Sequence, residues 1–103
     1  MKDGTRADYE FLEGLEREYI AALPARILDA LRALDDTLAG YRVTRLEHSL
    51  QTASRAEADG ADDEMILGAL LHDIGDVLAP ANHAEYAAAI LRPYVRNEVT
   101  WIV

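Results

Sequence analysis

Apolar residues in the first part of the chain recur every three or four positions, which is the spacing of one face of an α-helix. The first helix is predicted to begin after Thr5, which forms a capping-box pattern with Asp8, and to run to Leu23. Pro24 then starts a second helix, whose apolar spacing extends to Ala39–Gly40, where the glycine can end it in a left-handed conformation. The apolar positions are Tyr9, Phe11, Leu12, Leu15, Ile20, Ile27, Leu28, Leu31 and Leu34.

The middle of the chain predicts two further helices of different character. One covers 43–59 and stops at Gly60, and only one of its faces is apolar. The other has Asp62 as its N-cap, and its segment Met65–Leu71 is apolar all the way round. A helix without a polar face belongs in a core, so we expect the fourth helix to be central. The apolar stripe of the third helix consists of Val43, Leu46, Leu50, Ala53 and Ala56.

A capping-box pattern formed by Asn82 and Glu85 indicates a fifth helix that runs up to Pro93, whereas 96–103 is too short to classify. The chain has 103 residues, half of which are apolar, and this length matches one globular domain. We therefore predict an all-α fold in which 1–103 forms a single domain, built as a bundle of about five helices.

The charge balance narrows the possible partners. Lysine and arginine number 10 against 19 acidic residues, which gives a formal charge of -9. A chain without a broad basic surface is not expected to bind nucleic acid. No segment approaches the roughly 18 apolar residues of a membrane span, and Met1–Gly4 lacks the apolar core of a secretory signal. We expect a cytoplasmic protein with no membrane partner.

Cysteine is absent from the sequence, which restricts the chemistry that the chain can perform. Any metal must take histidine and carboxylate ligands, and any nucleophilic step must avoid sulfur. Such nitrogen and oxygen ligands suit iron, manganese or magnesium.

The candidate chemistry lies at His48 and at the adjacent pair His72–Asp73, which closes the apolar run of the fourth helix. A carboxylate brought into a core is costly unless it is paired or bound to a metal. Something cationic is therefore expected beside Asp73.

Each of these residues also has a simpler interpretation. His48 falls nearly opposite Leu46 and Leu50 on its helix, where a surface residue would lie. His72 can be a histidine favoured at a helix C-terminus by the helix dipole, and Asp73 can open a turn. His83 can merely occupy the first turn of the fifth helix. Spacing alone leaves these alternatives open.

Two stretches carry a resemblance that bears on this choice. Arg45–Ala53, read as RLEHSLQTA, and Gly68–Gly75, read as GALLHDIG, resemble the HD-domain superfamily, whose histidine and later His-Asp pair bind a metal centre within a helical bundle. Together with Asn82–Glu85 and Ala87–Leu91, they are most similar to the mixed-valence di-iron oxygenase branch. That branch includes the oxygenases of organophosphonate breakdown and, more distantly, inositol oxygenase. The resemblance covers about 43–91.

The resemblance implies a metal site. His48, His72 and Asp73 would ligate a first metal, and Asp73 would bridge to a second metal that also takes His83. The implied cofactor is a divalent metal, with iron first and manganese or magnesium as alternatives. The implied partner is a small-molecule substrate, and no catalytic residue beyond the ligands is assigned.

The chain departs from the family pattern in three respects. Relatives with complete di-metal centres carry a further histidine in a His-His-Gly-like stretch and a last aspartate on a later helix, and neither occurs here. The apolar end Trp101–Val103 resembles the middle of a family helix. We therefore expect an HD bundle that is incomplete at its C-terminus, and a homodimer or larger assembly in which chains cover each other's open face.

Substrate handling departs as well. Many relatives place a basic residue directly after the HD-x-Gly turn, where it can meet an anionic substrate, but this chain has Asp76. Leu38–Tyr41 also lacks the acidic gate that some oxygenases use. Arginines elsewhere are candidate anion contacts, although arginines on helices are usually solvated: Arg42, Arg45, Arg55, Arg92 and Arg96.

Three functional hypotheses follow. The first is a metal-dependent HD-domain protein that resembles di-iron oxygenases acting on small phosphonate or polyol-like substrates. The second is an HD-domain phosphohydrolase, in which the same metal pair lowers the pKa of a bound water and directs it at a phosphate ester. The third is a non-catalytic HD-fold module that self-associates.

Overall fold

The computed structural model describes residues 5–35 and 43–103, and in these two ranges it contains helices and no strand. The all-α expectation is therefore confirmed for the described residues. They form six α-helices and one short 3₁₀ helix, and the sixth α-helix lies in the segment that the sequence left unclassified. The elements are α1 (Arg6–Ala21), α2 (Leu23–Arg32), α3 (Arg45–Ala58), α4 (Asp63–Leu71), η1 (Ile74–Asp76), α5 (His83–Leu91) and α6 (Asn97–Ile102).

Several helix boundaries follow directly from local sequence signals. The hydroxyl of Thr5 accepts the backbone N–H of Asp8, and the Asp8 carboxylate accepts the N–H of Thr5, which completes the predicted capping box. Asp62 caps α4 by accepting the N–H of Met65 at 3.0 Å. Gly60, after the end of α3, has a φ of 82°, a left-handed conformation that glycine adopts without a steric penalty.

The predicted end of the second helix is wrong. α2 ends at Arg32, and the N–H of Leu34 bonds to the carbonyl of Leu31 in a tighter turn. Leu34 keeps the apolar spacing because it is fully buried, and its carbonyl accepts the N–H of Leu46 at the start of α3. At Leu34 the apolar spacing therefore indicates a buried residue and not a continuing helix. Gly40, predicted to end the helix, lies outside the described residues, as do Leu38–Tyr41 and Arg42.

The predicted cap of the fifth helix is also only partly right. α5 does begin after Asn82, but the Asn82 side chain makes no capping hydrogen bond. The helix is positioned instead by burial of Ala87, Ala88 and Leu91.

The main core lies where α2, α4, η1 and α5 meet. Its most buried members come from these four elements and from the turn after α2, so the core packs the end of α2, the end of α4, η1 and α5 against one another. α4 contributes Leu71 and the fully packed Gly68, in line with its expected central place. The buried cluster consists of Leu31, Leu34, Leu71, Ile74, Ala87 and Leu91.

The buried face of α3 differs from the predicted stripe. Ser49 is fully buried, whereas Leu50, predicted to face the core, keeps 48% of its surface exposed. Thr52, Ala53 and Ala56 are half-buried on the same side as Ser49. Small side chains therefore line the face that packs on α4, while Leu46 of the predicted stripe packs against the core as expected.

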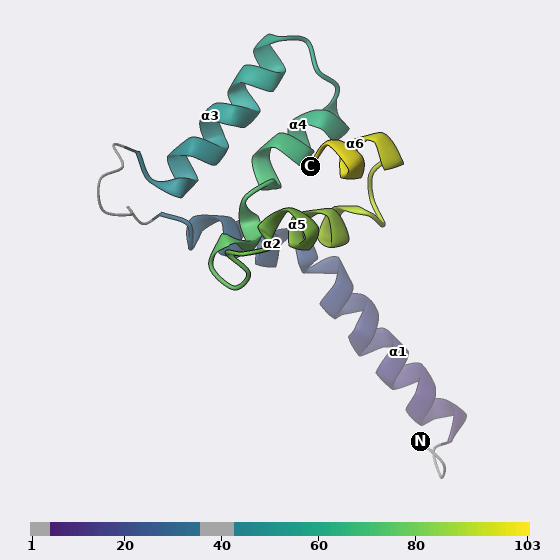
Figure 1. The fold of residues 1–103 in the computed structure, drawn as a ribbon. Coiled ribbons are helices and arrows are strands. Elements are labelled where there is room, and N and C mark those ends of the chain that lie inside the picture. The colour runs from purple at the N-terminus through teal and green to yellow at the C-terminus, as the bar shows by residue number, and fades with distance from the viewer. Residues whose placement is uncertain (1–4, 36–42) are drawn as a thin grey trace.

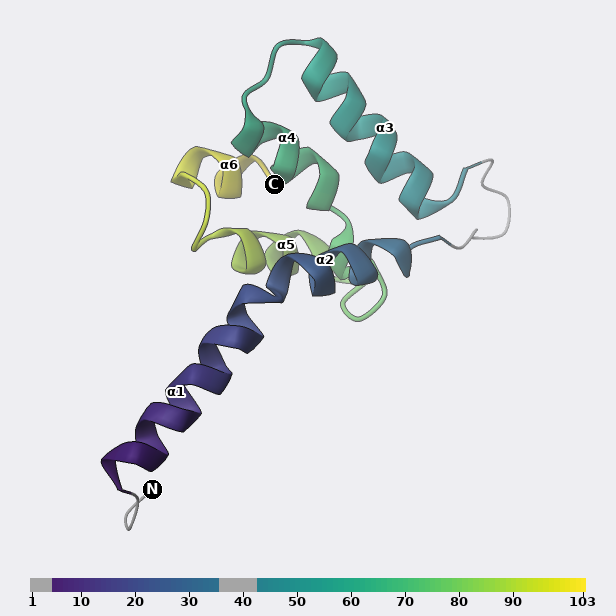
Figure 2. The same cartoon turned by 180° about the vertical axis from the view of Figure 1, so that it is seen from behind.

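The first helix has a different environment from the rest of the molecule. Figures 1 and 2 show α1 extending away from the other helices, which gather around α4 and α5. No residue of α1 is buried. The radius of gyration is 17.2 Å, compared with about 13 Å for a compact domain of this length. The projecting helix accounts for this elongated shape.

Within 5–35 and 43–103, no helix is both long enough and apolar enough to span a lipid bilayer.

Candidate metal centre

Asp73 lies in the short connection between α4 and η1. His72 caps the C-terminus of α4 with helical backbone angles, and Asp73 then turns the chain into the 3₁₀ helix. The adjoining Gly75 is buried against the Tyr86 ring, and a Cβ there would lie 2.7 Å from that side chain. This close approach fixes the turn against α5. The Asp73 side chain is only 20% exposed.

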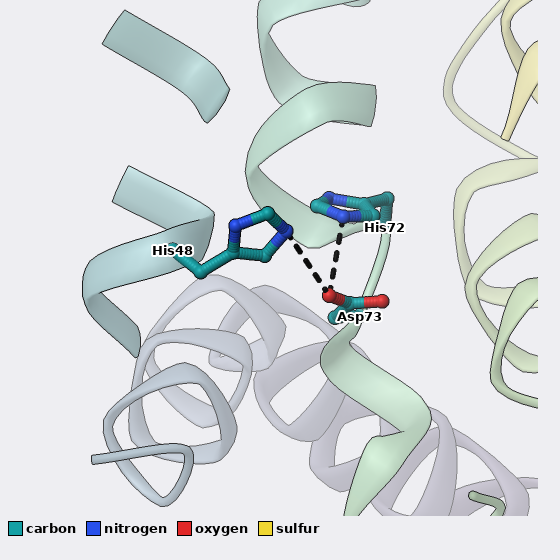
Figure 3. A group of neighbouring side chains, drawn as sticks. All are labelled: His48, His72 and Asp73. Atoms are coloured by element: carbon teal, nitrogen blue, oxygen red, sulfur yellow. Dashed lines mark ion pairs between the residues drawn. The ribbon is translucent and has the colours of Figure 1, made fainter. Parts of the chain in front are cut away.

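Three imidazoles surround the Asp73 carboxylate. Nε2 of His72 lies 3.2 Å from Oδ2, and Nε2 of His48 lies 3.6 Å from the same oxygen. Nε2 of His83 lies 3.2 Å from the other oxygen, Oδ1. Figure 3 shows His48 reaching from α3 and His72 from the end of α4 toward the carboxylate. All three histidines of the sequence therefore lie beside Asp73.

Backbone carbonyls orient two of these rings. Nδ1 of His72 lies 2.6 Å from the carbonyl of Ala69, and Nδ1 of His83 lies 3.3 Å from the carbonyl of Pro80. A carbonyl can only accept a hydrogen bond, so in each neutral ring Nδ1 carries the hydrogen. The lone pair of Nε2 then faces the Asp73 side, which is the arrangement that metal-binding histidines usually have.

Not all four predicted ligands lie equally close together. Ligand atoms of His48, His72 and Asp73 fall within 4.8 Å of one another, and the rings of the two histidines meet edge-on at 69°. His83 is outside this trio, and it approaches Asp73 at the other carboxylate oxygen, Oδ1. The donor set of imidazole nitrogens and one shared carboxylate suits a divalent cation such as iron or manganese. Its use as a metal site stays a prediction.

The site is open to solvent on one side. The His48 side chain is 51% exposed and that of His83 is 40% exposed, so the surface interpretation of His48 is right about exposure although the ring faces Asp73. Beside them lies a cavity of about 300 Å³, large enough for a small molecule. Its lining residues are Val43, Thr44, Arg45, His48, Asp73, Asp76 and His83.

An ion pair that the sequence did not anticipate borders this cavity. Nε of Arg45 lies 3.2 Å from Oδ2 of Asp76, and both side chains are about four-fifths buried. The sequence had marked Arg45 as a candidate anion contact and Asp76 as an unusual acidic substitution, but it gave no reason to pair them. Their elements meet only in the folded chain, because Arg45 begins α3 and Asp76 ends η1.

Arg96, another candidate anion contact, forms ion pairs with acidic residues of its own chain. Nη1 of Arg96 lies 2.8 Å from a carboxylate oxygen of Asp62, and Glu64 and Glu98 are also within ion-pair distance. The pKa of Asp62 is lowered, first by the hydrogen bond from the Met65 N–H and then by Arg96. Arg96 therefore joins the start of α6 to the start of α4 and lies away from the His-Asp cluster.

Comparison with known protein families shows which family the chain belongs to. Residues 45–103 match the family model of the HD domain, and this segment is more than half of the chain. The chain belongs to the HD-domain family. The match begins at the first residue of α3 and includes each predicted ligand. It confirms the HD resemblance inferred from the sequence.

A curated relative supports the more specific resemblance to the oxygenase branch. The HD-domain chain is 36% identical over 77 residues to a protein of Leisingera caerulea named [1-hydroxy-2-(trimethylamino)ethyl]phosphonate dioxygenase (glycine-betaine-forming). The aligned region is 64% of this chain and 39% of the relative. The chain therefore spans about two fifths of the length of this dioxygenase.

Proposed function

We propose that this HD domain binds divalent metal, iron in preference to manganese or magnesium, through His48, His72, Asp73 and His83. We further propose that the metal serves an oxygenase reaction on a small phosphonate or polyol-like substrate. The observation that supports metal binding is that the two oxygens of Asp73 face different histidines. Oδ2 faces the imidazoles of His48 and His72, and Oδ1 faces that of His83. A carboxylate in this position can be shared by two cations.

The named relative supports the oxygenase part of the proposal, since it is a phosphonate dioxygenase. When bound, iron would supply the redox chemistry that activates dioxygen. The chain's own residues have simpler tasks. His48, His72 and His83 hold the cation without adding charge, and Asp73 balances part of its charge. The adjoining cavity of about 300 Å³ holds the substrate beside them.

The first experiment measures metal content in protein purified without chelators. About two irons per chain support the oxygenase proposal, whereas no retained metal contradicts it. The double variant His72→Ala, Asp73→Ala should retain no metal, because it removes the shared carboxylate and one imidazole. Asp59→Ala is the matched control, since it removes an exposed carboxylate at the end of α3 and should leave metal content unchanged.

The second experiment separates oxygenase from phosphohydrolase. Metal-loaded protein is supplied with small phosphonates while dissolved oxygen is recorded, and separately with phosphate esters while released phosphate is recorded. Oxygen consumption that depends on the phosphonate supports the proposal. Phosphate release without oxygen consumption, at equal rates with manganese, would replace it with the hydrolase hypothesis. A metal-binding chain inactive in both assays would favour the non-catalytic module.

We also propose that the chain self-associates, as the sequence led us to expect. An apolar cavity of about 500 Å³ opens between the end of α1, α2, α4 and α5, and large apolar side chains along α1 are exposed. Contiguous apolar surface of this kind is usually covered in solution. Sedimentation at micromolar concentration should show a dimer or larger species, and a monomer at all concentrations would contradict this.

A further inference from the structure

Asp76 is an acidic side chain in the site to which the predicted ligand set gives no role. It ends the 3₁₀ helix η1, three residues after Asp73, and its side chain is 22% exposed. Its two oxygens have different neighbours. Oδ1 lies 3.7 Å from Nδ1 of His83, and Oδ2 lies 3.2 Å from Nε of Arg45.

The side of the imidazole that Asp76 faces decides what it can do. Asp73 approaches His83 at Nε2, whereas Asp76 approaches the same ring at Nδ1. A cation held between Nε2 and Asp73 would lie on the far side of the ring from Asp76. Asp76 is therefore placed to act on His83, not to ligate the same ion alongside it.

A carboxylate at this position favours one state of the ring. The Pro80 carbonyl already lies 3.3 Å from Nδ1, and Asp76 adds a negative charge on the same side. Both groups favour a hydrogen on Nδ1, which leaves the lone pair of Nε2 directed at the Asp73 side. Carboxylates behind metal-binding histidines fix ring orientation and strengthen the ligand in this way.

Arg45 supplies the support that keeps Asp76 in place. It is the first residue of α3, the helix that also carries His48, so the ion pair connects the helix of one predicted ligand to the turn beside another. The pair also balances charge, because an unpaired second carboxylate in a partly buried site would be costly.

We propose that Asp76 is a positioning residue that, held by Arg45, orients His83 so that Nε2 faces the cation shared with Asp73. The inference rests on the proposed metal-binding function and adds a role for a residue that is not a ligand. It also accounts for the acidic residue after the HD-x-Gly turn. At this position the chain uses its side chain to support a ligand, not to contact an anionic substrate.

The experiment is a Co²⁺ titration of the metal-free chain at fixed pH. Calorimetry measures the binding affinity, and the visible absorbance of the bound ion reports its ligands. Four variants are compared with the wild type: Asp76→Asn, Asp76→Glu, His83→Ala and the control Asp59→Asn. Loss of an orienting carboxylate typically costs about 10- to 100-fold in metal affinity. Asp76→Asn should therefore weaken the ion that depends on His83 by about this factor.

The remaining variants separate positioning from general damage. His83→Ala should abolish the same binding event, while the ion held by His48 and His72 keeps its affinity in both variants. Asp76→Glu keeps a carboxylate and should recover much of the lost affinity and the wild-type absorbance. Asp59→Asn makes the same charge change on the surface and should have no effect. Thermal unfolding in the presence of chelator checks that Asp76→Asn still folds.

Each failure has its own meaning. If the wild-type chain binds no Co²⁺, the proposed metal-binding function is wrong. If it binds Co²⁺ and His83→Ala weakens binding while Asp76→Asn does not, the function stands and the role of Asp76 is overturned. A single bound ion that neither variant alters would overturn it too. Equal weakening of every ion by Asp76→Asn would indicate a general electrostatic effect and would also contradict the inference.

Discussion

The segment from α3 to α6 and the first helix α1 differ in how their apolar residues are used. In α3–α6, helices pack on one another and bury residues such as Leu71, Leu91 and Val99 to 2% exposure or less. In α1, apolar side chains are present at helical spacing but remain exposed, with Phe11 at 66% and Tyr19 at 65%. The HD family match covers the first of these regions and not the second.

The difference shows that helix formation and helix burial have separate causes. α1 has a complete capping box, and α4 begins with a well-formed cap, so local signals define the start of both. Only α4 is surrounded by other helices. α1 is attached through its end, where Arg26 donates to the Tyr19 carbonyl at 2.6 Å and stacks 3.7 Å from the Tyr19 ring. Isolated helices of this length are marginal in water, so α1 lacks the packing that stabilises α4.

The largest expected difference in the free energy of unfolding appears when one leucine in each region is truncated to alanine. Leu91→Ala should lower the free energy of unfolding by roughly 2–5 kcal/mol, because a fully buried leucine leaves a cavity. Leu12→Ala should change it by less than about 0.5 kcal/mol, since Leu12 is 45% exposed and alanine favours helix. Urea denaturation at low protein concentration measures both. A Leu12→Ala loss close to that of Leu91→Ala would mean that α1 is packed in solution.

Two glycines provide the next comparison, with opposite signs. Gly75→Ala should destabilise by roughly 1–3 kcal/mol, because the new Cβ would lie 2.7 Å from the base of the Tyr86 side chain. Gly14→Ala, in the middle of α1, should stabilise by up to about 1 kcal/mol, since its Cβ would meet nothing closer than 3.9 Å. Thermal unfolding distinguishes them. Equal shifts in the same direction would contradict the proposed difference in packing.

The smallest effect concerns the pH dependence of the packed region. The pKa of Asp62 is lower in the folded state than its unfolded value of 3.8. The stabilisation that ionised Asp62 gives to the fold is therefore fully present above pH 3.8 and is lost as the pH falls through the pKa of the folded state. Asp62→Asn keeps a capping oxygen but cannot titrate. The melting temperature of the wild type should therefore fall more between neutral pH and pH of about 3 than that of the variant. Parallel curves would show that the charge of Asp62, beside the Met65 N–H and Arg96, contributes nothing measurable.

Sequence reasoning performed best where a signal is local. Thr5, Pro24, Gly60 and Asp62 each mark a helix boundary through their own backbone or side-chain chemistry, and the structure has each in the expected role. It failed at Leu34, where an apolar residue is buried by contacts from other helices and not by continuation of its own helix. Periodicity cannot distinguish these two causes.

The candidate site shows the same limit. His72–Asp73 could be singled out because the pair ends an apolar helix, whereas His48 and His83 needed the resemblance to favour a ligand role over a simpler one. The buried face of α3 was predicted only in part, since Ser49 is inward and Leu50 outward, against their polarity. The Arg45–Asp76 pair was also missed, because two residues on separate elements become neighbours only when α3 packs beside η1.

The predicted ligands come from different elements, with His48 on α3, His72 at the end of α4 and His83 at the start of α5. An ion that binds them would therefore act as a cross-link between helices, in addition to their hydrophobic packing and the Arg45–Asp76 ion pair. Ligand present at 100 times its dissociation constant adds about 2.7 kcal/mol to the stability of the state that binds it. Removal of such an ion would then lower the stability of the arrangement of α3, α4 and α5 as well as empty the site.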